Sequence, residues 1–169
     1  MQTWDAITAR RNVRAFSPEP IQPADLDRIL EAGRRAPSSQ NWQPWDFVVV
    51  TDQAQLQELS QVFQGAYHVA QAAAAIAIVG PVADNPYHRA QFDLGQAAMS
   101  MALAAADLGI GSSHAGVADM ALARRVLGLP ADRDWAILIS LGYPADRPLA
   151  PVRNPKRRPF DEVVHRQHW

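Results

Sequence analysis

The chain contains no cysteine among its 169 residues. This absence excludes disulfides, thiolate metal sites and a cysteine nucleophile, and it is compatible with a reducing compartment. An excess of one charge is also missing, since 16 Lys and Arg stand against 17 Asp and Glu and the formal net charge is −1. Such a balance provides no overall attraction to nucleic acid or to an anionic membrane surface.

Long apolar runs are absent as well. The longest, around Ala72–Val79, is far too short to cross a bilayer. The first residues, Met1–Asp5, lack the basic and apolar regions of a signal peptide. We therefore expect a cytoplasmic protein with no membrane and no nucleic-acid partner.

Signatures of several catalytic classes are lacking too. The segment Gly109–Gly111 has the first two glycines of a dinucleotide fingerprint, but His114 stands where the third would be and no acidic ribose partner follows. The serines lack a nucleophile-elbow context, which disfavours hydrolase chemistry. No metal is expected, because no pair with metal-ligand spacing occurs among the five histidines, His68, His88, His114, His165 and His168.

What is present suits one globular domain over residues 1–169, with 48% hydrophobic and 20% charged residues. Apolar spacing predicts helices near residues 3–10, 23–35 and 89–108, and two more that are capped by Asp52 and Asp119. Strands are predicted at Phe47–Thr51, Ile76–Gly80 and Trp135–Leu141, with a short one near Gly111–His114. Because helices and strands mix without a strict βαβ rhythm, we expect an α+β fold.

Two polar segments are the most informative features of the chain. The stretch Ala36–Trp45 combines hydroxyls, carboxamides, two prolines and two tryptophans just before the apolar run Phe47–Val50. Such a loop is suited to present hydrogen-bonding groups to a ligand. Upstream, Arg10, Arg11 and Arg14 place three guanidinium groups within five residues. Arginine is the side chain suited to bidentate contact with phosphate.

In order and spacing, these segments resemble the nitroreductase family of FMN enzymes, which carries R-x-S-x-[RK]-x-F and then P-S-S-x-N-x-Q-P-W. The residues that match are Arg10, Asn12, Arg14 and Phe16, and then Pro37, Ser38, Ser39, Asn41, Gln43, Pro44 and Trp45. Further matches occur at Gly109–Ser112, Leu127–Pro130, Leu141–Pro144 and Lys156–Phe160. The resemblance covers nearly the whole chain and departs at Asn12, where the family often has Ser, and at His114, where many members have Trp.

The resemblance implies an α+β fold in which a mixed sheet is flanked by helices. It also implies an intertwined homodimer whose exchanged C-terminal tail, residues 150–169, embraces the partner subunit. Apolar side chains in the tail give it something to dock with, namely Val152, Phe160, Val163, Val164 and Trp169.

For the site, the resemblance implies that Arg10 and an arginine of the tail bind the FMN phosphate. The family's tail arginine stands two residues before a proline, which points to Arg157, and Arg158 is the alternative if the alignment slips by one. Asn12 would reach the ribityl or phosphate region. Arg14 would lie by the pyrimidine edge of the flavin ring, where a cation stabilises the reduced flavin.

By the same resemblance, the loop Pro37–Asn41 reaches the flavin of the opposite subunit. The segment Gly111–Gly116 runs past the ring with backbone N–H groups near the flavin N5, and Gly116 permits a close approach. Trp45 is interpreted as core or interface packing, whereas Trp42 has either that role or a place in the substrate cleft. The full set of expected cofactor contacts is Arg10, Arg11, Asn12, Arg14, Pro37, Ser38, Ser39, Asn41, His114, Ala115, Gly116, Arg157 and Arg158.

The implied activity is transfer of a hydride from NADH or NADPH, through flavin N5, to electron-poor acceptors such as nitroaromatics and quinones, with ping-pong kinetics. No essential catalytic side chain is expected, because the flavin carries the chemistry. Only Gln64–His68 and Asp84–Arg89 are candidates to cover the cleft, so we expect an open site and broad acceptor tolerance.

Other interpretations remain open at this point. The fold also hosts reductive dehalogenation and fragmentation of the flavin, usually with lid elements that this chain lacks. A non-catalytic flavin-binding or sensing protein is a further alternative. A nucleic-acid-binding regulator would need a basic face, which the net charge of −1 does not support.

Overall fold

The computed structural model describes residues 2–81 and 90–169. Its elements, in chain order, are α1 (Thr3–Ala9), α2 (Pro23–Arg34), the 3₁₀ turn η1 (Ser39–Asn41), β1 (Asp46–Val50), α3 (Gln53–Leu59), the 3₁₀ segment η2 (Gln64–Gln71), β2 (Ala74–Pro81), α4 (Ala90–Asp107), β3 (Gly111–Gly116), α5 (Met120–Leu127), β4 (Arg133–Gly142) and α6 (Phe160–Val163). Helices and strands mix as expected, so the α+β class is confirmed.

The four strands form one sheet in the order β1-β2-β4-β3, and every neighbouring pair is antiparallel. The expectation of a mixed sheet is therefore wrong for the described strands. The reason is the path of the connection between the strands. The segment α3–η2 starts at the end of β1 and returns to the same edge of the sheet, so β2 runs antiparallel to β1. The only parallel pairing among the described residues is the isolated bridge between Asn12 and Ser112.

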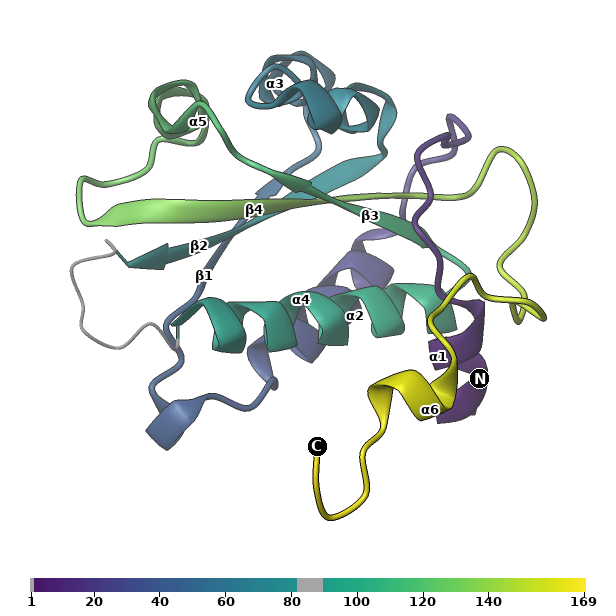
Figure 1. Ribbon diagram of the computed structural model, residues 1–169. Helices are drawn as coiled ribbons and strands as arrows, with labels where there is room; N and C mark the ends of the chain where they lie inside the picture. Colours follow the sequence, from purple (N-terminus) through teal and green to yellow (C-terminus); the bar gives the residue numbers. More distant parts are fainter. Residues whose placement is uncertain (1, 82–89) are drawn as a thin grey trace.

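Helices cover both faces of the sheet. Figure 1 shows α2 and α4 on one face and α3 and α5 on the other. Each strand contributes side chains to both helix layers, because successive side chains of a strand point to opposite faces of the sheet. Ile76 and Ile78 enter the core beneath α2 and α4, whereas Ala75 and Ala77 enter the core with α3, η2 and α5. A strand apolar on both sides, as β2 is, therefore lies in the middle of the protein.

The predicted helix caps are present. The Asp52 side chain accepts a hydrogen bond from the Gln55 N–H, and the Asp119 side chain accepts one from the Leu122 N–H. Gly128 ends α5 with φ of 65°, in the left-handed region that glycine adopts without steric cost. These local signals fixed the helix ends to within one or two residues.

One of the two segments expected to cover the cleft is partly buried. Gln64–His68 belongs to η2, where Ala66, His68 and Val69 are buried. Tyr67 of the same segment is 62% exposed, so its place over the cleft stays a prediction. The other segment, Asp84–Arg89, lies outside the described residues.

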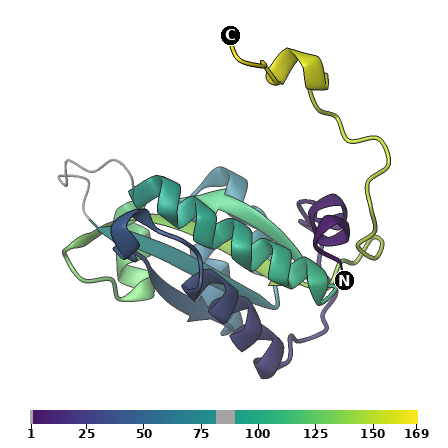
Figure 2. The ribbon, with the colours of Figure 1, turned by 90° about the horizontal axis from the view of Figure 1, so that it is seen from below.

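The C-terminal tail leaves the body of the molecule. Residues 151–169 are all exposed, and Figure 2 shows α6 projecting well away from the sheet and helices. The base of the tail is attached to the N-terminal region, where the Val152 N–H donates to the Thr8 carbonyl oxygen at 3.0 Å. The apolar tail thus has no core of its own in a single chain. No helix in the described parts of the chain is long and apolar enough to span a membrane.

Candidate functional site

The basic N-terminal segment lies along the free edge of β3. Asn12 pairs with Ser112 in the parallel bridge, and the Val13 N–H donates to the Ser112 carbonyl oxygen at 3.0 Å. A second bridge joins Phe16 to Pro144, just beyond β4. The tertiary structure therefore brings together two segments that lie about a hundred residues apart in the sequence.

Two glycines allow this segment to approach the sheet closely. A β carbon placed on Gly111 would lie 2.6 Å from Val13 Cγ2, and one placed on Gly142 would lie 2.8 Å from Phe16 Cδ1. Both distances are shorter than real β carbons tolerate. Val13 and Phe16 are themselves buried, so they anchor the arginines that alternate with them.

The three arginines of this segment differ in their partners. Arg11 donates to Asp146 Oδ1 at 2.6 Å and to the Arg147 carbonyl oxygen at 2.9 Å. Arg10 donates to Asn12 Oδ1 at 3.2 Å. Within residues 2–81 and 90–169, neither Arg10 nor Arg14 forms an ion pair, so both guanidinium groups retain their capacity for an anionic ligand.

Next to them, β3 presents His114, Ala115 and Gly116. His114 pairs with Ile139 and Gly116 with Ile137, so both project on the face of the sheet covered by α4. Burial lowers the pKa of His114, and the positive charge of Arg10 lowers it further. A β carbon on Gly116 would meet nothing within 4 Å. The Gly116 end of the strand is thus open, and the basic segment lies four residues nearer its start, at Ser112.

The polar loop takes an unusual backbone path. Gln40, Asn41 and Gln43 have φ of 53°, 57° and 53°. Ser38 Oγ accepts the Gln43 N–H at 2.9 Å, which closes the loop on itself. After the loop, Trp45 is buried and stacks on Phe47 with ring centroids 6.3 Å apart. The interpretation of Trp45 as a packing residue is confirmed.

Trp42 is 40% exposed and Pro37 and Asn41 are exposed as well. In the tail, Arg157 donates to the Lys156 carbonyl oxygen, and Arg158 contacts Glu162 at 3.4 Å. Both arginines lie on the projecting tail (Figure 2). A single chain therefore gathers Arg10, Asn12 and Arg14 with β3, while the tail arginines stand apart from them.

Sequence reasoning missed His68 as a neighbour of the site. Its side chain is 1% exposed, and Nδ1 lies 2.8 Å from Ser140 Oγ, which donates to the Ser113 carbonyl oxygen at 3.2 Å. Burial lowers the pKa of His68, and the charge of Arg14 lowers it further. No spacing signal marked this residue, because its partners come from strands far along the chain.

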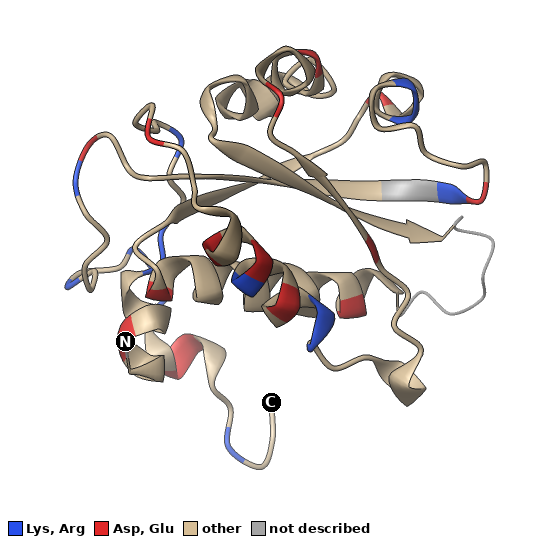
Figure 3. Cartoon of the chain, turned by 180° about the vertical axis from the view of Figure 1, so that it is seen from behind, with Lys and Arg blue, Asp and Glu red and all other residues tan. Residues whose placement is uncertain are grey.

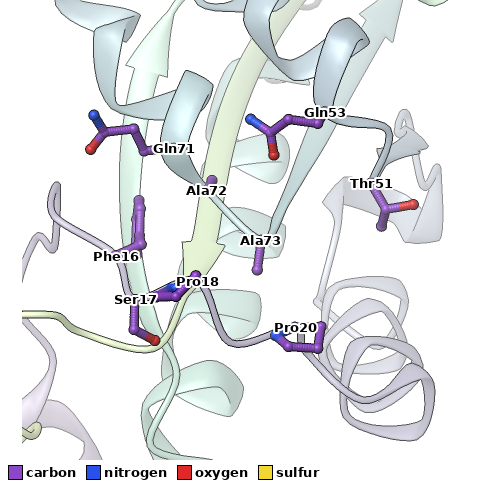
Figure 4. A pocket seen from close by; sticks show the side chains of 9 residues that line it. All are labelled: Phe16, Ser17, Pro18, Pro20, Thr51, Gln53, Gln71, Ala72 and Ala73. Carbon is purple, nitrogen blue, oxygen red and sulfur yellow. The ribbon is translucent and has the colours of Figure 1, made fainter.

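A cavity of about 460 Å³ lies between the Phe16–Pro20 segment and the adjoining ends of β1 and β2 (Figure 4). Its lining side chains are uncharged, and they include Thr51, Gln53 and Gln71. Another cavity, of about 420 Å³, lies at the base of the tail and is lined by Arg11, Arg147 and Arg153 among others. Neither cavity is lined by β3 or by the polar loop.

Comparison with known proteins shows the family to which the chain belongs. The sequence pattern of the nitroreductase family matches residues 7–83 and 80–143. A relative from Archaeoglobus fulgidus is 34% identical over 169 residues, which is 96% of each chain, and is provisionally named an NADH dehydrogenase/NAD(P)H nitroreductase. The chain belongs to the nitroreductase family. The matched ranges include both the Arg10–Phe16 segment and the polar loop.

Solved structures of family members share the fold. An FMN-dependent nitroreductase from Clostridium difficile R20291 is 26% identical, with a TM-score of 0.86 over 97% of this chain and 98% of that one. The NADPH:FMN oxidoreductase from Vibrio harveyi, solved in complex with NAD+, is 28% identical, with a TM-score of 0.83 over 97% of this chain and 76% of that one.

Charged residues of both signs are spread over this nitroreductase-family chain, and α2 is the helix that carries both (Figure 3). The charged residues within α5 are both basic, Arg124 and Arg125, and those within α1, α3, α4 and α6 are all acidic. Among the described residues, no group of three or more His, Cys, Asp and Glu is arranged to hold a metal ion.

Proposed function

We propose that this protein binds FMN and is an NAD(P)H-dependent oxidoreductase that reduces electron-poor acceptors such as nitroaromatics and quinones. The observation that carries the proposal is the seating of the Arg10–Arg14 segment against β3 at Ser112, with two guanidinium groups that have no ion pair among the described residues. Bound FMN would supply the hydride chemistry between nicotinamide and acceptor. The names of family members, one FMN-dependent and one solved with NAD+, support the same pairing of cofactors.

The residues present fit such a cofactor. An FMN phosphate is nearly a dianion and needs several donors, and Arg10 is available because it has no carboxylate partner in the described parts of the chain. Arg14 is available in the same way for the polar edge of the ring. Arg11 is held by Asp146, so its proposed contact with the cofactor would compete with an existing ion pair. Arg157, or Arg158 in its place, would complete the phosphate site.

We also propose that the working unit is a homodimer with two composite sites. The loop residues Ser38, Ser39 and Asn41 would meet the flavin of the other subunit. Large apolar side chains on α1, α4 and the tail are exposed in the single chain, namely Trp4, Ile7, Phe92, Met99, Phe160, Val163 and Trp169. Exposed apolar surface of this extent is typical of a protein–protein interface.

The chain supplies binding, orientation and charge rather than a reacting side chain. The guanidinium of Arg14 would stabilise negative charge on the reduced ring, and the β3 backbone at His114–Gly116 would orient the ring's reactive edge. A single open face would serve nicotinamide and acceptor in turn, which is the physical basis of the expected ping-pong kinetics.

The test is direct. Heat-denatured protein should release a yellow chromophore that co-elutes with FMN, and the native protein should bleach anaerobically with NADH or NADPH. Initial rates at several quinone concentrations should give parallel double-reciprocal lines. Arg14→Ala should slow bleaching more than it weakens FMN binding. A protein that holds FMN and is bleached by neither nicotinamide would instead be a non-catalytic flavoprotein, and a protein that cannot be reconstituted with FMN would refute the proposal.

A further inference from the structure

The loop that is proposed to reach the flavin has a backbone that must be held in place. Gln40, Asn41 and Gln43 all lie in the left-handed region, with φ between 53° and 57°. Residues with side chains adopt this region at an energetic cost, and they persist there only when the surrounding structure imposes it. The question is which groups impose it.

Bonds within the loop are local. The Asn41 N–H donates to the Ser38 carbonyl oxygen at 3.0 Å, and the Gln43 N–H donates to Ser38 Oγ at 2.9 Å. Gln43 Nε2 also donates to the Asn41 carbonyl oxygen at 3.1 Å. These contacts curl the loop, but they do not attach it to the rest of the protein.

The attachment comes from the start of α4. Asp93 Oδ2 accepts the backbone N–H of Ser39 at 3.0 Å. Gln96, one turn later, donates from Nε2 to the Pro37 carbonyl oxygen at 3.2 Å and lies 3.3 Å from Asp93 Oδ1. Two side chains of one helix face therefore hold the backbone of the loop just before its strained residues.

Asp93 is an unusual residue for its position. Its side chain is 1% exposed and is followed by Leu94 in the core beneath the sheet. A carboxyl group is costly to bury unless its oxygens are hydrogen-bonded, and removing such a partner is more damaging than removing an exposed one. An acidic side chain in this place is explained by the backbone N–H that it accepts.

We propose that Asp93 and Gln96 are positioning residues for the cofactor, which hold Ser38–Asn41 in the conformation that contacts the flavin of the partner subunit. This inference rests on the proposed function. Neither side chain touches the flavin; both act through the backbone of Pro37 and Ser39.

The variants are Asp93→Asn, Asp93→Ala and Gln96→Ala. Gln91→Ala is the matched control, because Gln91 is an exposed glutamine on the same helix. Asp25→Asn removes a carboxylate from the first turn of α2 and controls for the change of charge. Hydrogen exchange of the loop amides is measured on the apoprotein, with the β2 amides as internal reference, and the FMN dissociation constant is measured by fluorescence titration.

We expect the amides of residues 39–43 to exchange faster in the Asp93 and Gln96 variants, with β2 unchanged. FMN binding should weaken by about tenfold or more in Asp93→Ala, the loss of a hydrogen bond to a charged group. The FMN affinity of Asp93→Asn should lie between that of Asp93→Ala and that of the wild type, because the carbonyl oxygen of the asparagine still accepts a hydrogen bond from the Ser39 N–H. Both control variants should match the wild type.

Wild-type exchange in the loop of Asp93→Asn and Gln96→Ala would overturn the inference, and so would a loosened loop with unchanged FMN affinity. If Asp93→Ala does not fold, the results for Asp93→Asn and Gln96→Ala decide whether the inference holds. A wild-type protein that binds no FMN would refute the proposed function instead, and loop exchange in the apoprotein would then show whether Asp93 holds the loop at all.

Discussion

Replacing Gly111 by alanine is expected to destabilise the protein, because the N-terminal segment rests directly on this glycine. The new β carbon would lie 2.6 Å from Val13 Cγ2, 2.7 Å from Val13 Cβ and 3.0 Å from Val13 Cγ1. Rotating the valine side chain moves its methyl groups but not its β carbon. The clash is therefore relieved only if the backbone of residues 10–16 moves away from β3.

The cost is that of overpacking a filled core. Val13 is 1% exposed and has no free space to enter, so we expect a loss of about 1–3 kcal/mol in the free energy of unfolding. With a urea m-value of about 2 kcal/mol/M, the unfolding midpoint should fall by about 0.5–1.5 M. Val13→Ala should not rescue the variant, because the β carbon of residue 13 remains in place.

The assay is urea unfolding of the apoprotein at a fixed protein concentration, with FMN titration in parallel. Gly116→Ala on the same strand is the matched control, because its β carbon would meet nothing within 4 Å. That variant should keep its stability and still weaken FMN binding, if the flavin lies against the end of β3. An unchanged midpoint in Gly111→Ala, or an equal loss in Gly116→Ala, would refute the reasoning.

Three further predictions follow from the charges and the tail. Arg10→Ala and Arg157→Ala should each weaken FMN binding by about 1–3 kcal/mol in fluorescence titrations. Weaker binding in Arg158→Ala alone would move the tail assignment by one residue. Unchanged FMN binding in all three variants would contradict the phosphate site. Burial, and then the charge of Arg14, hold the pKa of His68 below its ordinary value of 6.5. The unfolded chain therefore binds a proton at His68 that the folded chain does not, and the free energy of unfolding should fall as the pH drops through about 6.5. His68→Gln should flatten that slope in urea titrations at several pH values, and an unchanged slope would exclude His68 as its source. Deleting the chain after Leu149 should cost both dimer and flavin, as measured by light scattering and absorbance, and a flavin-loaded monomer would count against the composite site.

Much of the fold was predictable because its signals are local. Asp52, Asp119 and Gly128 mark helix ends by hydrogen bonding and backbone freedom that depend on a few neighbouring residues. The mixed sheet was predicted wrongly, since strand direction depends on where a connection re-enters the sheet. The burial of Ala66 and His68 was not evident from the sequence for a similar reason, because burial is decided by elements that pack from elsewhere.

The candidate site divides in the same way. Its Arg10–Arg14 and Pro37–Trp45 segments were evident from residue types and order alone. The roles of Asp93 and His68 were not evident from the sequence. Their hydrogen-bond partners, the Ser39 N–H and Ser140 Oγ, lie about fifty and seventy residues away in the chain.

The sequence by itself determined which local elements form, that the chain is a nitroreductase-family α+β protein, and which basic and polar segments it carries. Those properties depend on the chemistry of neighbouring residues and on motif order. Only the tertiary structure decided that Val13 rests on Gly111 and that Asp93 holds the loop. It also decided that Arg11 pairs with Asp146, whereas Arg10 and Arg14 have no ion pair within residues 2–81 and 90–169. Each of these depends on the close packing of segments distant in the chain, which no local pattern specifies.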